Sequence, residues 1–197
     1  MKLDIPAGDF AGYIFDLDGT LVDTMPLHYR AWNEAMQRAG LREELSEDLF
    51  YKLGGVPTRR VAELLAGHYG LTLNVDQVFR EKETLFVELR SEMRRIEPVV
   101  DFARKAVAQR FPVSVASGGP RDIVRHTLEL MQLRELFPVV VTPEDVEHGK
   151  PAPDMFLLAA KKMGVASKKC LVFEDAEPGF RAAEAAGMQW VRVPSRP

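Results

Sequence analysis

Short runs of apolar residues alternate with amphipathic helical patterns along most of the chain. Near-continuous apolar character predicts strands that are covered on both faces, which is typical of parallel sheets. The predicted strands are Tyr13–Leu17, Val113–Ser117, Val139–Thr142, Cys170–Glu174 and Trp190–Val193, and the predicted helices between the later strands are Pro98–Gln109, Pro120–Gln132, Pro153–Met163 and Glu177–Ala186. This alternation predicts an α/β fold, a Rossmann-like three-layer α/β/α sandwich with a mostly parallel sheet.

One segment, from residue 24 to about residue 95, interrupts the alternation because it shows no strand pattern. The spacing of its apolar residues predicts three helices instead. The first ends at Gly40, the second could be capped by Thr58, and the third is long, with an apolar stripe from Phe79 to Met93. The segment is therefore predicted to be helical throughout.

This helical segment divides the chain into two predicted domains. Residues 1–23 and 96–197 are expected to form the α/β core, and residues 24–95 an all-helical cap inserted after the first core strand. An insertion at that point lies over the carboxyl ends of the strands, where α/β folds bind their ligands. A mobile lid is the functional interpretation, and a purely structural addition is the alternative.

The strongest chemical signal follows the first predicted strand directly. Asp16 and Asp18 stand two residues apart in the loop Asp-Leu-Asp-Gly-Thr, and Gly19 allows the backbone to turn sharply there. Taken alone, the pair fits an ordinary acidic turn about as well as a functional site. The functional interpretation depends on further polar clusters after other strands.

Three such clusters are present, each after a predicted strand. Ser117-Gly118-Gly119 combines a hydroxyl with glycine amides before a helix, which is an arrangement that binds anions. Lys150 lies between glycine and proline, and the adjacent acids Glu174 and Asp175 favour a cation site. In a parallel sheet these clusters are expected to meet at one edge. Because hard oxygen ligands occur without clustered His or Cys, the expected ion is Mg²⁺.

Composition narrows the class of partner. The net charge of the 197 residues is −3, which gives no basic footprint for nucleic acid. The single cysteine, Cys170, excludes an internal disulfide and a cysteine-based zinc site, and its apolar surroundings favour burial. No apolar stretch approaches the length of a membrane span, and the first residues lack the apolar region of a signal peptide. We expect a cytoplasmic, monomeric protein that acts on a small phosphorylated metabolite and has no membrane partner.

Taken together, the four clusters resemble the four motifs of the haloacid dehalogenase-like hydrolase superfamily, and the resemblance covers nearly the whole chain. The string DLDGTLVDTMPLHYRAW resembles the β-phosphoglucomutase branch, and within it the small bacterial phosphatases that act on fructose-1-phosphate-like substrates. The resemblance implies that Asp16 is the nucleophile. It also implies that Asp18 is the general acid and then the general base, roles that require a pKa nearer neutrality than in solution.

The resemblance further implies how ion and phosphate are held. The metal ligands would be the Asp16 carboxylate, the Asp18 backbone carbonyl and Asp175, supported by Glu174. The phosphoryl oxygens would be held by Ser117, by Lys150 and by the glycine amides of Gly118 and Gly119. Thr20 would orient the loop.

Five residues of the helical segment are candidate contacts to the substrate. His28 resembles, in its position, a histidine that in the β-phosphoglucomutase branch couples cap closure to catalysis. A structural hydrogen bond explains the presence of His28 about equally well. Lys82 interrupts an apolar stripe and either reaches the surface or points at an anion. Gly55, Arg59 and Arg60 resemble the specificity loop of the cap, but both arginines also fit the first turn of an ordinary helix.

The function that these signals favour is a Mg²⁺-dependent phosphatase of sugar phosphates that works through an aspartyl-phosphate. A phosphosugar mutase of the β-phosphoglucomutase type is the alternative, weakened because Pro57 and Thr58 separate the glycine-valine pair from Arg59. A third possibility is a non-enzymatic signalling module phosphorylated on aspartate. Such modules lack a large helical insertion after the first strand.

Overall fold

Strand β1 lies at the centre of a five-stranded sheet in the order β5-β4-β1-β6-β7, and every neighbouring pair is parallel. The structure is a computed structural model that describes residue 1 and residues 3–194. The strands are β1 Gly12–Phe15, β4 Val113–Ala116, β5 Val139–Val141, β6 Cys170–Glu174 and β7 Gln189–Arg192. The predicted strands are thus confirmed, with ends that differ by at most two residues.

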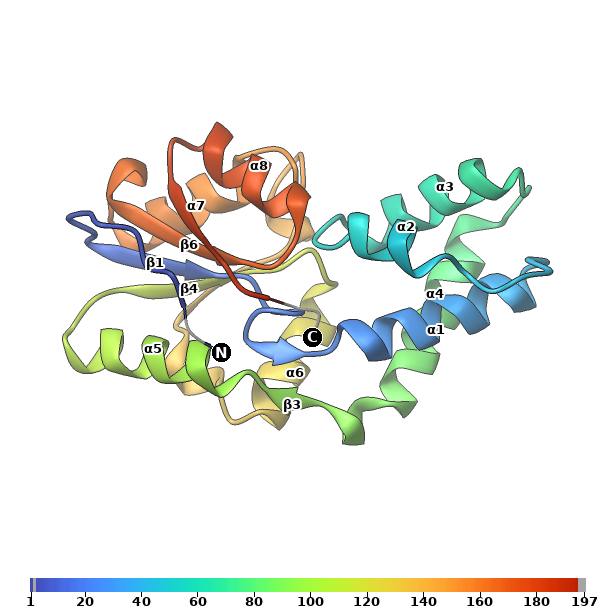
Figure 1. Ribbon diagram of the computed structural model, residues 1–197, viewed down its shortest axis with the longest axis horizontal. Helices are drawn as coiled ribbons and strands as arrows, with labels where there is room; N and C mark the ends of the chain where they lie inside the picture. The colour runs from blue at the N-terminus through green and yellow to red at the C-terminus, as the bar shows by residue number, and fades with distance from the viewer. Residues whose placement is uncertain (2, 195–197) are drawn as a thin grey trace.

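Helices cover both faces of this sheet (Figure 1). They are α5 Glu97–Ala108, α6 Arg121–Leu130, α7 Asp154–Met163 and α8 Glu177–Ala185. Because successive strand residues point to opposite faces, Phe15 joins the apolar cluster of α5 and α6, whereas Ile14 joins that of α7 and α8. The predicted three-layer sandwich is confirmed, and Cys170 is buried in it as expected.

Four helices, separate from the sandwich layers, occupy the segment after β1 (Figure 1). They are α1 Met25–Arg38, α2 Glu47–Lys52, α3 Thr58–Tyr69 and α4 Val75–Glu88. Helix α1 packs against α4, and α4 also packs against α3. The aromatic side chains Trp32 and Phe86 are buried in this group.

Three details of the helical segment differ from the expectations. Thr58 is the first residue of α3 and Pro57 precedes it as the cap, so Thr58 does not cap the helix. Helix α4 ends at Glu88, so Met93 of the expected stripe lies beyond it, after a 3₁₀ turn. Helix α2 was not predicted, because its six residues are too few for a clear apolar period.

A short antiparallel ribbon joins the helical segment to the sandwich. Strand β2 Val22–Asp23 pairs with β3 Arg94–Arg95. The expectation that no strand would appear between residues 24 and 95 was therefore wrong at its end. Two-residue strands carry no alternation that a sequence pattern could reveal. The remaining short elements are the 3₁₀ helices η1 Arg90–Glu92, η2 Arg134–Leu136, η3 Pro143–Asp145 and η4 Ser167–Lys169.

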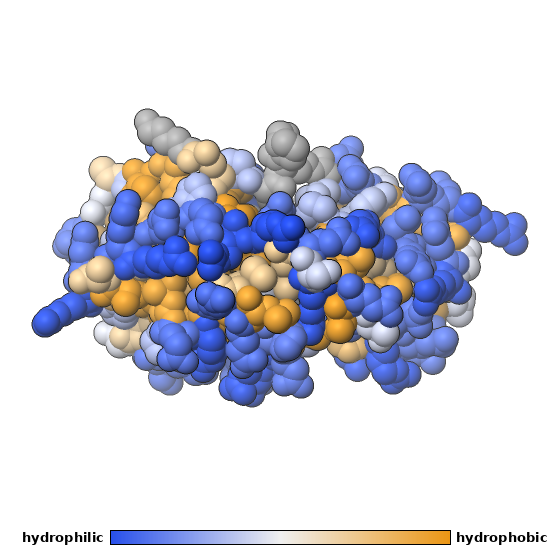
Figure 2. All heavy atoms as spheres, turned by 90° about the horizontal axis from the view of Figure 1, so that it is seen from below, coloured by the Kyte–Doolittle hydropathy of each residue, from blue (hydrophilic) through white to orange (hydrophobic). Residues whose placement is uncertain are grey.

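Hydrophilic side chains cover most of the face shown in Figure 2, with apolar atoms visible between them. The exposed large apolar residues include Val107, Leu130 and Leu157. Single exposed apolar residues of this kind are usual on soluble proteins. Among the described helices, none combines the length and the apolar character that crossing a bilayer requires.

Candidate active site

A buried lysine joins two carboxylates from separate strands. Lys150 Nζ donates hydrogen bonds of 2.6 Å to Asp16 Oδ1 and of 2.6 Å to Glu174 Oε1. Asp16 follows β1, Glu174 ends β6, and Lys150 lies in the loop between β5 and α7. The parallel sheet therefore brings together three of the residues that the sequence analysis placed at one edge.

The charges of this group depend on one another. Burial raises the pKa of Asp16 well above its usual value, Lys150 opposes this rise, and Glu174 adds to it. Burial alone would lower the pKa of Lys150, but Asp16 and Glu174 outweigh burial and raise it. The lysine thus remains charged, and one cation faces two carboxylates inside the protein.

Three acids of this region suit a divalent cation. Asp16, Glu174 and Asp175 each offer a carboxylate oxygen, and these oxygens lie within 4.8 Å of one another. Oxygen-only donors with negative charge fit Mg²⁺. Besides its contact with Lys150, Glu174 accepts hydrogen bonds through Oε2 from the amides of Asp175 at 2.8 Å and Ala176 at 3.0 Å. Because both of its oxygens accept hydrogen bonds from the protein, Glu174 is suited to support the ion site without being a main ligand.

Two glycines leave the space that these acids need. Gly19 has a φ of 79°, and a Cβ atom there would lie 2.3 Å from Asp175 Oδ2. Gly179, in the first turn of α8, is closer still: its Cβ would lie 1.9 Å from Glu174 Oε1. Such separations are impossible for non-bonded atoms, so a side chain at either position would force the neighbouring acid to move.

Asp18 lies outside the cluster of three acids and has its own partners. Thr24 Oγ1 donates to Asp18 Oδ1 at 2.6 Å, and His28 Nε2 lies 3.1 Å from the same oxygen. Burial acts to raise the pKa of Asp18, but His28, Thr24 and Lys82 outweigh burial and lower it to about 2. The pKa of Asp18 therefore lies below its ordinary value rather than nearer neutrality as expected, because donors and cations surround the carboxylate.

The ring of His28 also packs within the helical segment. The imidazole stacks on Phe86 with centroids 3.9 Å apart. Burial lowers the pKa of His28, Lys82 lowers it further, and Asp18 opposes both effects. Because the Asp18 carboxylate can only accept, the imidazole donates to it from Nε2. His28 thus links α1 and α4 to the loop that carries Asp18, whereas His68, His126 and His148 are exposed as expected.

The loop after β4 is folded on itself. Ser117 Oγ accepts a hydrogen bond of 3.1 Å from the Gly119 amide, and the serine is buried. Gly118 and Gly119 line the cavity described below. Thr20 is also buried, and its Oγ1 has no hydrogen-bond partner among the described residues. The hydroxyls of Ser117 and Thr20 are accordingly held inside the protein near the acidic loop.

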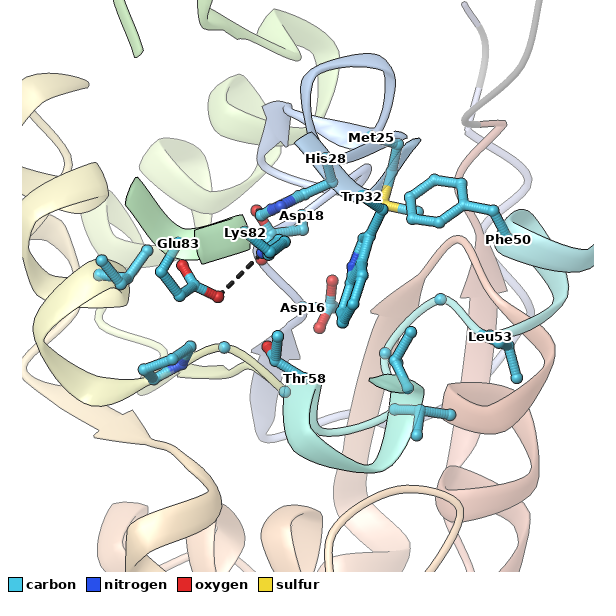
Figure 3. A pocket seen from close by; sticks show the side chains of 18 residues that line it. Asp16, Asp18, Met25, His28, Trp32, Phe50, Leu53, Thr58, Lys82 and Glu83 are labelled. Atoms are coloured by element: carbon cyan, nitrogen blue, oxygen red, sulfur yellow. Dashed lines mark hydrogen bonds and ion pairs between the residues drawn. The ribbon is translucent and has the colours of Figure 1, made fainter. Parts of the chain in front are cut away.

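A narrow cavity of about 60 Å³ lies between the helical segment and the sandwich. Ligand pockets usually enclose roughly 300–1,000 Å³, so this space is much smaller than a typical binding site. The cavity is lined by Asp16, Asp18, Met25, His28, Trp32, Phe50, Leu53, Gly54, Gly55, Val56, Thr58, Val61, Lys82, Glu83, Gly118, Gly119, Pro120 and Ile123. Figure 3 shows Asp16 and Asp18 reaching it from the β1 loop, His28 from α1, and Lys82 and Glu83 from α4.

The loop before α3 closes this cavity on one side. A Cβ atom at Gly118 would lie 2.5 Å from the Gly55 carbonyl oxygen, and one at Gly149 would lie 2.5 Å from Pro57 Cγ. Gly55 itself has a φ of 75°, and a Cβ there would lie 3.3 Å from Lys150 Cδ. The two halves of the protein therefore meet closely at Gly55 and Pro57, and Gly55 lies beside the buried lysine.

The candidate arginines of the same loop do not enter the cavity. The Arg59 side chain is 59% exposed, pairs with Asp76 and lies over the Phe79 ring at 5.1 Å. The Arg60 side chain is 61% exposed and pairs with Glu63. Both arginines therefore lie at the surface, as expected if they are residues of the first turn of an ordinary helix.

Lys82, in contrast, is buried at the cavity wall. Its Nζ donates to Glu83 Oε1 at 2.9 Å and lies 5.8 Å and 5.1 Å from the ring centroids of Trp32 and Phe86. The sequence analysis offered a choice between the surface and an anion. The structure places the ammonium group inside, beside a carboxylate of its own chain.

Four residues of this site were not identified from the sequence. Thr24 and Glu83 provide polar partners for Asp18 and Lys82, Trp32 lines the cavity, and Gly179 makes room for Glu174. Trp32 lies in the first predicted helix of the segment, and a helical pattern does not distinguish a cavity wall from the core. Glu83 offered one usable signal, since a buried lysine requires a nearby acid.

Comparisons with known proteins give a consistent picture. A family model described as haloacid dehalogenase-like hydrolase matches residues 13–193. The chain is 38% identical over 184 residues to fructose-1-phosphate phosphatase YqaB of Escherichia coli (strain K12), covering 93% of this chain and 96% of that protein. It is 30% identical to a phosphorylated carbohydrates phosphatase of Thermotoga maritima, with coverages of 89% and 81%. A solved hydrolase from Pseudomonas syringae has a TM-score of 0.83 at 26% identity, covering 91% of this chain and 83% of that chain.

Proposed function

The chain belongs to the haloacid dehalogenase-like hydrolase family, as its four motifs led us to expect, and on that premise we propose that it is a Mg²⁺-dependent phosphatase of small phosphate esters. The proposed substrates are sugar monophosphates of the fructose-1-phosphate type. Two relatives that match most of its length carry names of this kind. The observation that carries the proposal is the buried group of Asp16, Lys150 and Glu174, beside the Asp175 carboxylate.

The proposed reaction has two steps. The Asp16 carboxylate attacks phosphorus, the bond to the ester oxygen breaks, and Asp18 protonates the departing alkoxide. Water then attacks the aspartyl-phosphate, Asp18 accepts its proton, and phosphate leaves with Asp16 restored. Asp18 is ionised in the free protein, since its pKa is about 2. It must therefore gain a proton when the phosphate dianion binds beside it, because a neighbouring negative charge raises the pKa of a carboxyl group.

The acidic cluster is the proposed Mg²⁺ site. Asp16, Asp175 and the Asp18 backbone carbonyl would hold the ion, with Glu174 in support. The bound cation would reduce the repulsion between the Asp16 carboxylate and the phosphate. Lys150 already offsets part of the negative charge, and it fixes the Asp16 carboxylate in one orientation.

The phosphoryl oxygens have donors in the core. We assign this role to Ser117, to the amides of Gly118 and Gly119, and to Lys150. Donors fixed before the reaction stabilise charge as it develops on those oxygens. Thr20 supports the loop from inside, where its hydroxyl is buried.

Residues 24–95 are proposed to act as a mobile cap on a core of residues 1–23 and 96–197. The small cavity supports this proposal, since about 60 Å³ is far below the space of a usual ligand pocket. Substrate must therefore reach Asp16 while the loop at Gly55 stands away from Gly118. Closure then brings His28 and Lys82 to the bound ester and excludes water.

We further propose that the protein acts as a monomer on a small metabolite. Nucleic acid and membranes are not proposed as partners, and the cytoplasm is the proposed place of action. The signalling-module alternative is set aside because α1–α4 follow the first core strand.

Release of inorganic phosphate from fructose-1-phosphate in the presence of Mg²⁺ tests the proposed function. The same protein is also assayed for conversion of β-glucose-1-phosphate to glucose-6-phosphate. Release without isomerisation is the expected result. Isomerisation with little release would assign the protein to the mutases instead, and Asp16→Asn is the control for both assays.

A further inference from the structure

Lys82 and Glu83 form a buried ion pair at the wall of the cavity, on a different element from the nucleophile Asp16. Both side chains reach the cavity from α4, whereas Asp16 reaches it from the end of β1 (Figure 3). Lys82 is 1% exposed and Glu83 is 9% exposed. This part of the wall would therefore face the organic part of a phosphate ester whose phosphoryl group lies at Asp16.

The positive charge of Lys82 is offset on several sides. Glu83 Oε1 lies 2.9 Å from its Nζ, which also lies over the rings of Trp32 and Phe86. The other residues that line the helical side of the cavity include the apolar Met25, Val56 and Val61. With its cation paired, the wall presents little net positive charge to a ligand.

Glu83 also has an acceptor that the protein does not use. Its Oε2 is buried and has no hydrogen-bond partner among the described residues. A buried carboxylate oxygen without a donor destabilises the folded state. A hydroxyl group of a bound ligand would supply the missing donor. Such a hydroxyl would belong to an uncharged polyol or sugar.

We propose that Glu83 determines substrate specificity by selecting esters whose far end is uncharged and hydroxylated. Its Oε2 accepts a hydrogen bond from a substrate hydroxyl, and its charge cancels that of Lys82 so that a second phosphate is not attracted. The inference rests on the proposed phosphatase function and adds a preference for monophosphates over bisphosphates. It involves no covalent step beyond that function.

The test measures kcat/KM for fructose-1-phosphate, fructose-1,6-bisphosphate and butyl phosphate with the unmodified protein, Glu83→Gln and Glu83→Ala. Glu88→Gln is the matched control, because it removes the same charge from an exposed position on the same helix. Thermal unfolding measures whether each variant is folded. If Glu83→Gln does not fold, Glu83→Ala provides the test. Fructose-1,6-bisphosphate carries a charged group at its far end, and butyl phosphate has no hydroxyl on its organic part.

Two ratios decide the outcome. In the Glu83 variants, kcat/KM for the bisphosphate relative to fructose-1-phosphate should rise roughly tenfold, because the Lys82 charge is released. The value for fructose-1-phosphate relative to butyl phosphate should fall several-fold, mainly through KM, because the hydroxyl loses its acceptor. An unchanged value of either ratio overturns the assignment of Glu83. Failure of the unmodified protein to release phosphate from any ester contradicts the proposed function itself.

Discussion

Gly179 packs directly against the Glu174 carboxylate, since a Cβ atom on Gly179 would lie 1.9 Å from Glu174 Oε1. The same oxygen accepts the hydrogen bond from Lys150, which also holds Asp16. A helix residue that touches neither ion nor substrate in our proposal thus controls the orientation of the nucleophile.

Gly179→Ala should therefore lower both stability and activity. Glu174 must move, so the expected loss is about 1–3 kcal/mol in the free energy of unfolding, together with a large fall in kcat. Gly67→Ala is the control, because nothing lies within 4 Å of a Cβ at that helical position. It should stabilise the protein by about 0.5–1 kcal/mol. Urea unfolding and phosphate release measure the two effects, and equal behaviour of the two variants would contradict the structural account.

Asp16→Asn should lower kcat by several orders of magnitude, since an amide is not a nucleophile toward phosphorus. The fold should remain, because the change is isosteric and Lys150 keeps its bond to Glu174. Phosphate release and thermal unfolding are measured on the same samples. Retained activity in this variant would mean that another residue attacks the ester.

Removal of Mg²⁺ with EDTA should eliminate phosphate release, and added Mg²⁺ should restore it. Asp175→Asn should raise the Mg²⁺ concentration needed for half-maximal activity, because one of the three clustered carboxylates loses its charge. Glu177→Gln, which changes an exposed acid nearby, should leave that concentration unaltered. The metal assignment fails if the EDTA-treated protein retains full activity.

Asp18→Asn should affect poor leaving groups most. An alkoxide needs a proton as it leaves, whereas nitrophenolate does not, so kcat/KM for a sugar phosphate should fall by roughly 100-fold or more. The fall for nitrophenyl phosphate should be much smaller. Equal losses on the two esters would show that Asp18 does not act as the acid, and inhibition by inorganic phosphate checks that binding is retained.

Asp18 should also leave a signature in the pH dependence of stability. Its pKa is about 2 in the folded protein, below the ordinary value of 3.8. A lowered pKa stabilises the fold above the ordinary value, and this stabilisation is lost as pH falls toward the folded value. Between pH 5 and pH 2 the unmodified protein should lose about 2 kcal/mol more than Asp18→Asn. Asp4→Asn, at an exposed site, should follow the unmodified protein; a pH profile shared by all three would contradict the lowered pKa.

The sequence predicted the sandwich well because its strands are buried on both faces and carry strong apolar runs. Cys170–Glu174 was predicted with both of its ends. The β2–β3 ribbon escaped prediction because its stability comes from pairing across the inserted segment, with Val22 opposite Arg95. Such long-range pairs leave no local pattern.

The site was predictable where strand ends fix it and less so elsewhere. Asp16 and Lys150 were named because the parallel sheet brings their loops together. Arg59 was named from its loop alone, but its direction depends on Asp76, which lies on another helix. The pKa of Asp18 was misjudged because Thr24 and His28 act on it through space.

The ribbon of β2 and β3 is the place where the chain both leaves and rejoins the sandwich, with Asp23 beside Arg94. In our proposal the helical segment moves as a cap, and this ribbon would act as its hinge. Parting Pro57 from Gly149 then requires backbone rotation at only a few residues, and none of the four ribbon residues lines the cavity. If residues 24–95 move as the proposed cap, the rate of product release would depend on ribbon residues that lie outside the cavity.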